Sequence, residues 1–296
     1  MKHPRQQPWL YAEGLRNVAS VLPLSADEAR HVVRVLRCRS RDFITAFDGS
    51  GHMRDGCLEI EKKNVSLHFT EPLRQAPKPA RQFQLLLCLP NHVTTFEEIL
   101  KKTCELGIQS IQPLFSERTE RLHWSPDVWE QRSERWHRIL IEACKQAKNP
   151  FLPQLNPPVP LRELQTLPTG YCIHGTLDAA SSQASHAQDI SLFENFSPAP
   201  SETLFSCLIG PEGGFSDAEE AFLSKISRGV HLPTCVLRTE TAVVSLLTIL
   251  KVWCTRHDKI FPLDTPLALS SNKSRVREAS CGEGAGRTKQ NKTKER

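Results

Sequence analysis

From residue 83 onward, short apolar segments alternate with segments that carry helix signals, and this alternation limits the possible folds more than any other feature. The apolar segments are residues 83–89, 108–115, 171–174 and 204–209. Continuous apolar runs of this length are typical of strands buried on both faces. Strands that alternate with helices form a mainly parallel sheet, so the sequence predicts an α/β fold for this part of the chain.

The helix signals between the apolar segments are capping residues and one proline. In chain order they are Thr95 with Glu98, Ser125 with Pro126, and Ser216 with Glu219. The first of these helices is expected to end at Gly107 and the third near Gly229, where glycine favours termination. A short segment follows at residues 230–232, and a last apolar helix is expected from Thr239 to about His257. The polar stretch 178–202 is typical of a loop or a weak helix.

Residues 1–75 show a different pattern, in which one capped helix precedes short strands. Ser25 and Glu28 form a capping box for a helix that runs through Leu36. Three predicted strands follow at 43–47, 56–60 and 65–69, with a turn at 48–51 between the first and the second. Short strands at this spacing indicate a small barrel. The proline-rich stretch 72–79 is typical of a stiff linker. We therefore expect one domain over 1–75, a second over 76–262, and a tail over 263–296.

Net charge is distributed unevenly along the chain. Residues 1–75 hold 12 Lys and Arg and 9 Asp and Glu, residues 76–266 hold 18 and 21, and residues 267–296 hold 8 and 3. The three net charges are thus +3, −3 and +5. This asymmetry favours a polyanion bound by an end domain, with small-molecule chemistry in the middle of the chain.

The densest basic cluster lies in the first domain. It consists of Arg30, Arg34, Arg37, Arg39 and Arg41. Guanidinium groups match phosphate oxygens, so these arginines are candidate RNA-binding residues, and a solvated helix-and-turn face is the alternative. The basic tail, poor in aromatic residues, is expected to be disordered. It has two interpretations as well, a solubilising segment or an accessory contact to RNA.

Ten cysteines raise the question of metal sites or disulfides. No two form a C-x-x-C pair, and most lie in apolar runs such as residues 86–89. Cys254 and His257 lack a second pair to complete a zinc site, so we expect reduced packing cysteines and no metal. The chain has no run of eighteen apolar residues and no apolar signal core at its N-terminus. A cytoplasmic protein is therefore expected.

The strongest candidate for a ligand site is the segment Gly210-Pro211-Glu212-Gly213-Gly214-Phe215, between a predicted strand and a predicted helix. Three glycines let a ligand approach the main chain closely, and amide groups at a helix N-terminus suit anionic or polar groups. The segment is neither a Walker loop nor G-x-G-x-x-G. A structural turn is the alternative, although such a turn would need only one glycine.

A second candidate segment is Leu237-Arg238-Thr239-Glu240-Thr241-Ala242, between the last short strand and the last helix. Charged and hydroxyl side chains at the carboxyl edge of an α/β sheet lie where ligands usually bind. The alternative is a structural role, in which these residues cap the helix and form an ion pair. The case for a ligand site becomes stronger when this segment is considered together with the glycine loop.

Further motifs occur in a fixed order around these two segments. They are 31–37 (HVVRVLR) and 47–51 (FDGSG), then 102–107 (KTCELG), 111–114 (IQPL), 116–118 (SER), Arg135-Trp136, Glu142-Ala143 and Gln146. In this order the motifs resemble those of the RsmE family of SPOUT-class RNA methyltransferases, whose members methylate N3 of a uridine in 16S ribosomal RNA. The resemblance covers residues from about 13 to 257.

The resemblance implies an N-terminal PUA-like β-barrel that binds RNA and a C-terminal SPOUT α/β domain with a deep trefoil knot. It also implies a homodimer that binds S-adenosylmethionine in the knot, near the dimer interface. Carried over by motif, the cofactor-binding residues are Leu208, Gly210, Glu212, Gly213, Gly214, Leu232, Leu237, Thr239 and Ala242. His174 and Gly175, at the end of the preceding strand, join this set.

Methylation of N3 removes its proton, and the charge of the resulting anion spreads onto the two uracil oxygens. An arginine beside these oxygens would stabilise that charge, and Arg118 and Arg238 are the candidates. Glu240 would orient a group or accept the proton. Each of the three could instead form a structural ion pair. No metal or redox cofactor is required.

The chain departs from the family pattern at two positions. Pro90-Asn91-His92 replaces a common Pro-Lys-Gly, and Asn149 replaces a basic residue. Both changes would remove an RNA or cofactor contact, so they bear on the exact substrate more than on the methyltransferase class. Separately, two alternatives to uridine N3-methylation are considered. One is a non-catalytic RNA-binding or ribosome-assembly factor that keeps the fold. The other is a SPOUT methyltransferase with another RNA target.

Overall fold

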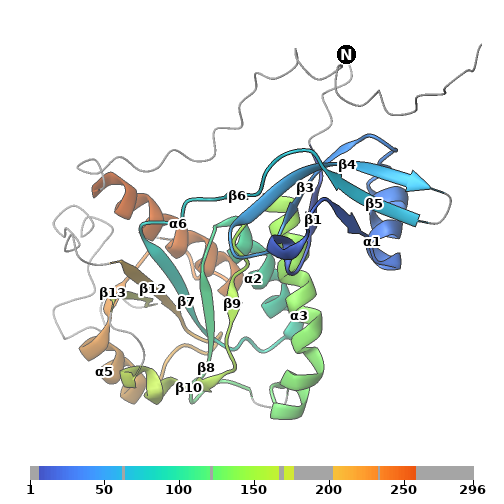
Figure 1. The fold of residues 1–296 in the computed structure, drawn as a ribbon. Coiled ribbons are helices and arrows are strands. Elements are labelled where there is room, and N and C mark those ends of the chain that lie inside the picture. Colours follow the sequence, from blue (N-terminus) through green and yellow to red (C-terminus); the bar gives the residue numbers. More distant parts are fainter. Residues whose placement is uncertain are drawn as a thin grey trace, which may run out of the picture.

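The chain folds around two β-sheets, one in each half (Figure 1). The structure, a computed structural model, describes residues 7–61, 64–120, 123–166, 170–176, 203–232 and 234–257. The tail 263–296 and the polar stretch 178–202 of the sequence analysis lie outside the described residues.

The first sheet is a mixed sheet with the strand order β1-β3-β4-β5-β2, and β6 pairs with β4. Its strands are β1 (Trp9–Tyr11), β2 (Val21–Pro23), β3 (Phe43–Phe47), β4 (His52–Glu61), β5 (Asn64–Phe69) and β6 (Arg74–Gln75). β1 runs parallel to β3, and the other pairs are antiparallel. The three predicted strands are confirmed as β3, part of β4 and β5. β6 lies within the predicted linker, so that stretch is partly strand rather than linker alone.

The helix predicted through Leu36 is only partly correct. A short 3-10 turn, η1 (Leu15–Asn17), precedes α1 (Ala26–Arg30), and Ser25 caps α1 by accepting a hydrogen bond from the Glu28 amide at 3.2 Å. The chain then widens into a π-helical turn, η2 (His31–Val35). Such turns are rare and occur often at functional sites.

The second sheet is entirely parallel, as predicted, with the order β10-β8-β7-β12-β11-β13 and with β9 on β8. Its strands are β7 (Gln82–Cys88), β8 (Ser110–Phe115), β9 (Gln154–Leu155), β10 (Val159–Pro160), β11 (Tyr171–Gly175), β12 (Leu204–Ile209) and β13 (Arg228–Val230). Its helices are α2 (Val93–Glu105), α3 (Pro126–Ala147), η4 (Leu161–Thr166), α5 (Asp217–Ile226) and α6 (Thr239–His257). β13 begins two residues before the predicted segment 230–232.

The capping box predicted for α2 is wrong. The N-cap is His92, whose side chain makes no capping hydrogen bond, and the Thr95 amide already donates to the His92 carbonyl at 3.1 Å. Thr95 therefore lies inside the first turn. In contrast, Ser216 and Glu219 form the predicted reciprocal capping box of α5, which ends at Ile226 instead of near Gly229.

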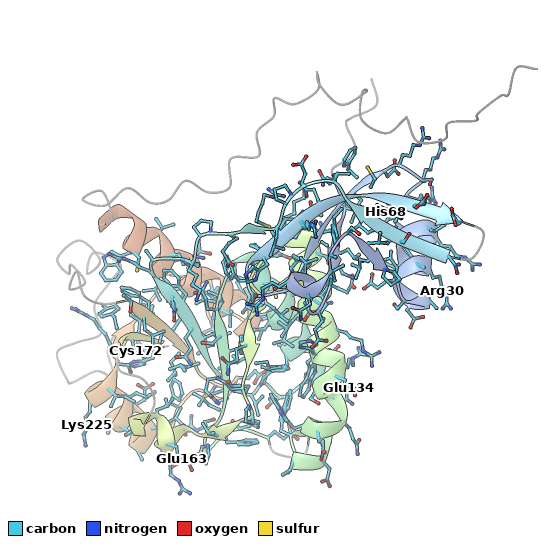
Figure 2. All side chains as sticks on the ribbon, viewed as in Figure 1. Arg30, His68, Glu134, Glu163, Cys172 and Lys225 are labelled. Carbon is cyan, nitrogen blue, oxygen red and sulfur yellow. The ribbon has the colours of Figure 1, made fainter. Side chains whose placement is uncertain are left out.

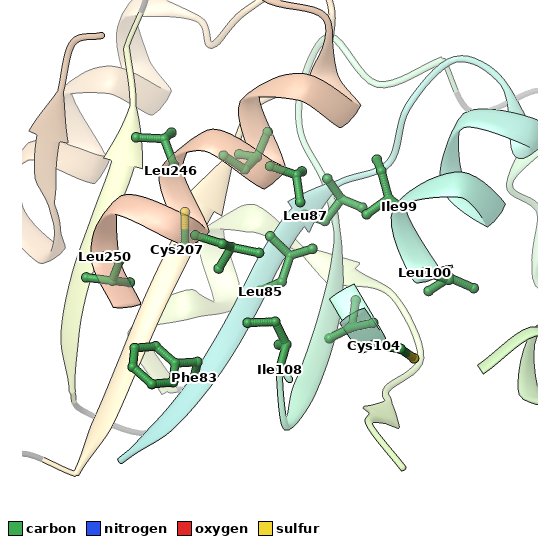
Figure 3. Close-up of a cluster of buried hydrophobic side chains, with 14 of the residues drawn as sticks. Phe83, Leu85, Leu87, Ile99, Leu100, Cys104, Ile108, Cys207, Leu246 and Leu250 are labelled. Atoms are coloured by element: carbon green, nitrogen blue, oxygen red, sulfur yellow. The ribbon is translucent and has the colours of Figure 1, made fainter. Parts of the chain in front are cut away.

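The main core lies between the parallel sheet and the helices α2, α3 and α6. Leu85, Leu87 and Cys207 of the sheet pack with Leu246 and Leu250 of α6 and are fully buried (Figure 3). Aromatic side chains extend this core beneath α2 and α3. The ring centroid of Phe96 lies 5.3 Å from that of Trp124 and 5.1 Å from that of Trp136. Trp124 is thus a core residue, and its indole donates to the Pro90 carbonyl at 2.8 Å.

The two sheets are joined through the turn at Gly49-Ser50-Gly51. The Gly51 amide donates to the Pro150 carbonyl at 3.0 Å, and the Leu152 amide donates to the Gly49 carbonyl at 2.8 Å. Gly51 has φ 96°, and a Cβ there would lie 2.5 Å from the Phe151 ring, so only glycine fits. These bonds position the first domain on α3 and thereby define a cleft between them.

Candidate functional site

A cavity of about 370 Å³ opens at the carboxyl ends of β11 and β12. Its walls come from Gly175 and Thr176, Ile209 with the glycine loop 210–215, residues 230–232 and 234–239 with the start of α6, and Arg118, which follows β8. Ligand sites in open parallel sheets lie at this edge, and a volume of this size is typical of a small-molecule site.

The glycine loop has a conformation that other residues would disturb. A Cβ at Gly210 would lie 2.9 Å from the Phe215 ring, and Gly214 has φ 71°. The Gly214 amide donates to the Pro211 carbonyl at 2.9 Å, which closes a tight turn before α5. The loop therefore needs glycine at both positions, and both glycines line the cavity.

Two glutamates tie the loop to neighbouring strands. Glu212 accepts hydrogen bonds from the Asn91 amide, beyond β7, at 3.2 Å. Glu219, which is buried, accepts from the Glu117 amide at 2.8 Å and from the Ser216 amide at 3.0 Å. These bonds hold the ends of β7, β8 and β12 in register around the cavity.

Two arginines place positive charge at the cavity. The Arg118 guanidinium donates to the Gly213 carbonyl at 2.7 Å, so the glycine loop fixes its position. Arg238 also lines the cavity, and its carbonyl accepts hydrogen bonds from the Thr241 and Ala242 amides in the first turn of α6. Within the described part of the chain neither guanidinium forms an ion pair.

Most of the predicted site residues lie together at this cavity. The lining includes Arg118, Gly175, Gly210, Glu212, Gly213, Gly214, Leu232, Leu237, Arg238, Thr239 and Ala242. Leu208, His174 and Glu240 are not part of it. Leu208 is fully buried in the core beside α5, and Glu240 lies in the first turn of α6, where a carboxylate favours the helix N-terminus.

His174 lies directly behind the cavity. Its ring is 4% exposed, and Nδ1 is 2.9 Å from the Ser227 hydroxyl. Nε2 lies 3.6 Å from a carboxylate oxygen of Glu220, which does line the cavity. The ring therefore supports the wall, and we expect it to act on a ligand only through Glu220.

Several residues of the lining were not predicted from the sequence, including Thr176, Asp217, Glu220 and His231. The Nδ1 atom of His231 is buried and has no hydrogen-bond partner among the described residues. A buried ring nitrogen in that state is available to a ligand. The place of His231 at the cavity follows from the end of β13 at Val230, which the sequence pattern did not locate.

Nine cysteines lie in the described residues, all as free thiols. Six are buried, as expected for packing residues, whereas Cys235 is exposed and lines the cavity. Burial raises the pKa of the Cys172 thiol to about 12 and that of Cys207 well above its ordinary value, so both stay protonated. Among the described residues no group of three or more His, Cys, Asp or Glu side chains is arranged to hold a metal ion.

The predicted arginine cluster lies on the first domain, away from the cavity. Arg34, Arg37, Arg39 and Arg41 are exposed, and Arg30 forms only an exposed ion pair with Asp27 at 3.7 Å. None of the five lines the cavity. No helix within the described residues is long and apolar enough to cross a membrane.

A parallel α/β domain with a glycine-lined cavity is thus joined to a strand-rich domain with exposed arginines, an arrangement expected of a protein that binds a small ligand and a polyanion. Comparison with known families narrows this expectation. The RNA methyltransferase domain family matches residues 76–251, and the RNA methyltransferase PUA domain family matches residues 24–70. The chain belongs to the RsmE family of RNA methyltransferases.

Individual relatives agree with this assignment. Ribosomal RNA small subunit methyltransferase E of Aquifex aeolicus is 30% identical over 64% of this chain and 76% of its own length. The protein of the same name from Buchnera aphidicola is 25% identical over 83% of this chain and 96% of its own length. A crystal structure exists for the Neisseria gonorrhoeae protein of that name, bound to S-adenosyl methionine. That protein is 24% identical in sequence, and its structure matches 83% of this chain and 98% of its own chain with a TM-score of 0.66. This similarity shows that the two chains share a fold.

Proposed function

We propose that this chain is an S-adenosylmethionine-dependent methyltransferase that acts on N3 of a uridine in the 16S ribosomal RNA of the small ribosomal subunit. One observation carries the proposal. The glycine loop, Arg118, and the segment from Leu237 to Ala242 converge on one cavity, in a chain of the RsmE family. The relatives named above, with their printed substrate and cofactor, support it.

The residues at the cavity fit the proposed cofactor. Main-chain groups of the glycine loop lie open on one side, and Asp217 and Glu220 bring carboxylates to a site that would hold a sulfonium and an ammonium. We infer that the cofactor is held by Gly175, Gly210, Glu212, Gly213, Gly214, Leu232, Leu237, Thr239 and Ala242. Leu208 and His174 support this site from behind it, and His231 Nδ1 adds an unpartnered polar atom.

S-adenosylmethionine supplies a methyl group on a sulfonium, so the N3–methyl bond forms as the sulfur–methyl bond breaks. The main task of the protein is then to align the uridine and exclude water. Arg118 and Arg238, at the rim of the same cavity, would stabilise the negative charge that develops on the uracil oxygens as the N3 proton leaves. Glu240 remains a candidate proton acceptor or orienting group, although its side chain does not line the cavity.

The domain plan of the proposed enzyme follows the family. Residues 1–75 would form a PUA-like barrel that binds RNA, residues 76–262 a SPOUT domain with a deep trefoil knot, and residues 263–296 a basic tail. We infer a homodimer, and two exposed apolar residues beside the cavity and on α6 support it, Val236 at 80% and Val252 at 48% exposure. We infer a cytoplasmic location, because the proposed substrate is part of the small ribosomal subunit.

The test of the proposed reaction is mass spectrometry of ribosomal RNA from a strain in which the gene is deleted. We expect 3-methyluridine to disappear from 16S ribosomal RNA and to return when the gene is restored. Unchanged 3-methyluridine would eliminate this reaction and favour another RNA target.

The alternative from another class is a non-catalytic RNA-binding or ribosome-assembly factor. Of the two departures from the family pattern, Asn149 has a structural role, since its side chain accepts a hydrogen bond from the Phe151 amide at 3.0 Å. At Asn91 only the main-chain amide is used, as a donor to Glu212. Isothermal titration with S-adenosylmethionine separates the two functions, since a factor that only binds RNA needs no cofactor affinity.

Charge reversal at Arg34 and Arg37 should weaken RNA binding. Both side chains are exposed on the first domain, so their replacement by glutamate should leave the fold intact. The logarithm of the affinity for RNA should then depend less steeply on the logarithm of the salt concentration, because fewer phosphates are neutralised. Binding titrations at several salt concentrations measure the slope. An unchanged slope would leave the cluster as a solvated face.

A further inference from the structure

A chain of polar contacts runs from the end of α5 through His174 to the wall of the cavity. His174 lies near the end of β11 and is 4% exposed. Its Nδ1 atom is 2.9 Å from the hydroxyl of Ser227, which follows α5. Its Nε2 atom is 3.6 Å from a carboxylate oxygen of Glu220, in the first turn of the same helix. Of these three residues only Glu220 lines the cavity, so the buried ring contacts the site from behind.

The hydrogen bonds of Ser227 determine which nitrogen of the ring carries a proton. The Ser227 hydroxyl has a single hydrogen and donates it to the Leu223 carbonyl at 2.8 Å. Toward His174 the hydroxyl can therefore only accept, so Nδ1 is the donor. Nε2 is left to face Glu220, and it presents a second N–H to the carboxylate when the ring is charged.

The surroundings of the ring leave it little room to turn. A Cβ at Gly229, the residue paired with His174 on β13, would lie only 3.3 Å from Nε2. On another side the ring of Phe215 lies edge-on, with 6.4 Å between the ring centroids and 79° between the planes. A buried polar group that is packed and hydrogen-bonded in this way is rigid. The ring is therefore a fixed support for whatever its Nε2 atom contacts.

Carboxylates and arginines lie on different elements of the cavity wall. Asp217 and Glu220 are three residues apart on α5, so they share one face of the helix, and both line the cavity. Arg118 follows β8, and Arg238 precedes α6. The α5 side of the cavity thus carries negative charge, which suits a cationic group of a ligand.

We propose that His174 is a positioning residue, which holds the Glu220 carboxylate at the cavity for a cationic group of the bound cofactor. The proposal rests on the proposed function, because S-adenosylmethionine has two such groups, an ammonium and a sulfonium. A carboxylate in the first turn of a helix is favoured by the helix N-terminus alone, but that effect requires no buried ring behind it. Methyl transfer turns the sulfonium into a thioether, so the cofactor loses one of its two positive charges as it becomes product.

Isothermal titration of the full chain with three probes tests the role of Glu220. S-adenosylmethionine carries both cationic groups, S-adenosylhomocysteine only the ammonium, and 5′-methylthioadenosine neither. Glu220→Gln keeps the shape of the side chain and removes its charge, so the affinity for S-adenosylmethionine should fall by roughly tenfold or more. The affinity for 5′-methylthioadenosine should stay within roughly twofold of the parent value. An equal fall for S-adenosylhomocysteine assigns Glu220 to the ammonium, and an unchanged affinity assigns it to the sulfonium.

Two changes at His174 test the support itself, with melting temperatures measured alongside. His174→Asn keeps a donor near the position of Nδ1 and loses Nε2, whereas His174→Gln keeps a donor near the position of Nε2. We expect His174→Asn to weaken S-adenosylmethionine binding by roughly threefold to tenfold, with 5′-methylthioadenosine unaffected, and His174→Gln to retain more of the affinity. The double variant His174→Asn, Glu220→Gln should bind no more weakly than Glu220→Gln alone, because the ring acts through that carboxylate.

Glu134→Gln is the matched control, because it removes the same charge by the same change. The Glu134 side chain is 83% exposed on α3, which lies across the domain from α5 and its Lys225 (Figure 2). Glu134 does not line the cavity. This variant should bind all three probes as the parent chain does.

Parent-like affinity for S-adenosylmethionine in Glu220→Gln would overturn the proposal, as would an equal loss for all three probes, which indicates a damaged cavity. Additive losses in the double variant would overturn the role of His174. Failure of the proposed function gives a different pattern. The parent chain itself then binds neither S-adenosylmethionine nor S-adenosylhomocysteine, and this inference fails with it.

Discussion

Replacement of Gly213 by valine is expected to abolish binding of S-adenosylmethionine while both domains stay folded. A Cβ at this position would meet only the Arg118 side chain among the described residues, at 3.5–3.6 Å, which is ordinary van der Waals contact. The fold can therefore accept the added atoms, which we expect to take up space in the cavity that Gly213 and Arg118 both line. We expect the dissociation constant to rise roughly a hundredfold or more, in line with the cost of overfilling a packed site.

Substitution at Gly213 tests the role of the glycine loop in cofactor binding better than substitution at Gly210 or Gly214. At Gly210 a Cβ would press on the Phe215 ring, and at Gly214 the positive φ would strain any other residue, so loss of binding there could reflect a damaged loop. Gly14→Ala is the matched control. Gly14 has φ 69° and open space around it, so alanine there costs roughly 1 kcal/mol of stability without approaching the cavity.

Isothermal titration of both variants, with melting temperatures from circular dichroism, separates binding from stability. We expect Gly14→Ala to lower the melting temperature and to keep parent affinity. Gly213→Ala should give an intermediate loss. Parent-like affinity in Gly213→Val would contradict the assignment of the glycine loop as the cofactor cradle and would leave it as a structural turn.

The parts of the fold that the sequence predicted are those specified by local chemistry. Apolar runs such as 204–209 match the strand β12 residue for residue, because a strand buried on both faces tolerates few polar side chains. The capping box at Ser216 and Glu219 and the N1 proline at Pro126 located two helix starts correctly. The capping box at Thr95 failed, because the chain turns into α2 earlier, at His92, without any side-chain cap.

The elements that were missed depend on contacts distant in sequence. β1 is three residues long and exists because it pairs in parallel with β3, some thirty residues later in the chain. β6 is two residues of a proline-rich stretch that pair with β4. Neither has the length or alternation that marks a strand in a sequence, so tertiary pairing alone determines them.

The residues of the candidate site likewise fall into those that local sequence patterns indicated and those that only the fold brings to the cavity. Its glycines and arginines were visible because their residue types are unusual after buried strands, and the family pattern assigned them. His231, Asp217 and Glu220 became apparent only when β13 and α5 were placed at the cavity. Their residue types are common on protein surfaces, and no local pattern distinguished them from solvated side chains.

Removal of the Arg118 guanidinium is expected to reduce the turnover number by roughly a hundredfold to a thousandfold, the usual effect of losing one preorganised donor to a developing anion. The side chain is held by one hydrogen bond to the Gly213 carbonyl at 2.7 Å. Arginine has five donors, so others remain for a uracil oxygen. Arg118→Ala should therefore impair the chemical step and leave the affinity for S-adenosylmethionine almost unchanged.

The pH dependence of the methylation rate distinguishes this role from a structural one. A cation beside the uracil oxygens lowers the pKa of N3, so the rate of the parent enzyme should level off at a lower pH than that of Arg118→Ala. Raising the pH should therefore restore part of the activity of the variant. Arg138→Ala is the matched control, because Arg138 lies exposed on α3 and pairs only with Glu134, at 3.2 Å, among the described residues.

Arg238→Ala, measured in parallel, identifies which of the two arginines stabilises the anion. Both line the cavity, but Arg118 is anchored to the glycine loop, whereas the guanidinium of Arg238 has no such bond among the described residues. An anchored donor needs no reorganisation as charge develops, so we expect the larger loss and the larger shift in pH profile at Arg118. If Arg118→Ala keeps the parent turnover and pH profile while Arg238→Ala loses both, Arg238 stabilises the anion, and the bond between Arg118 and Gly213 serves only to hold the loop.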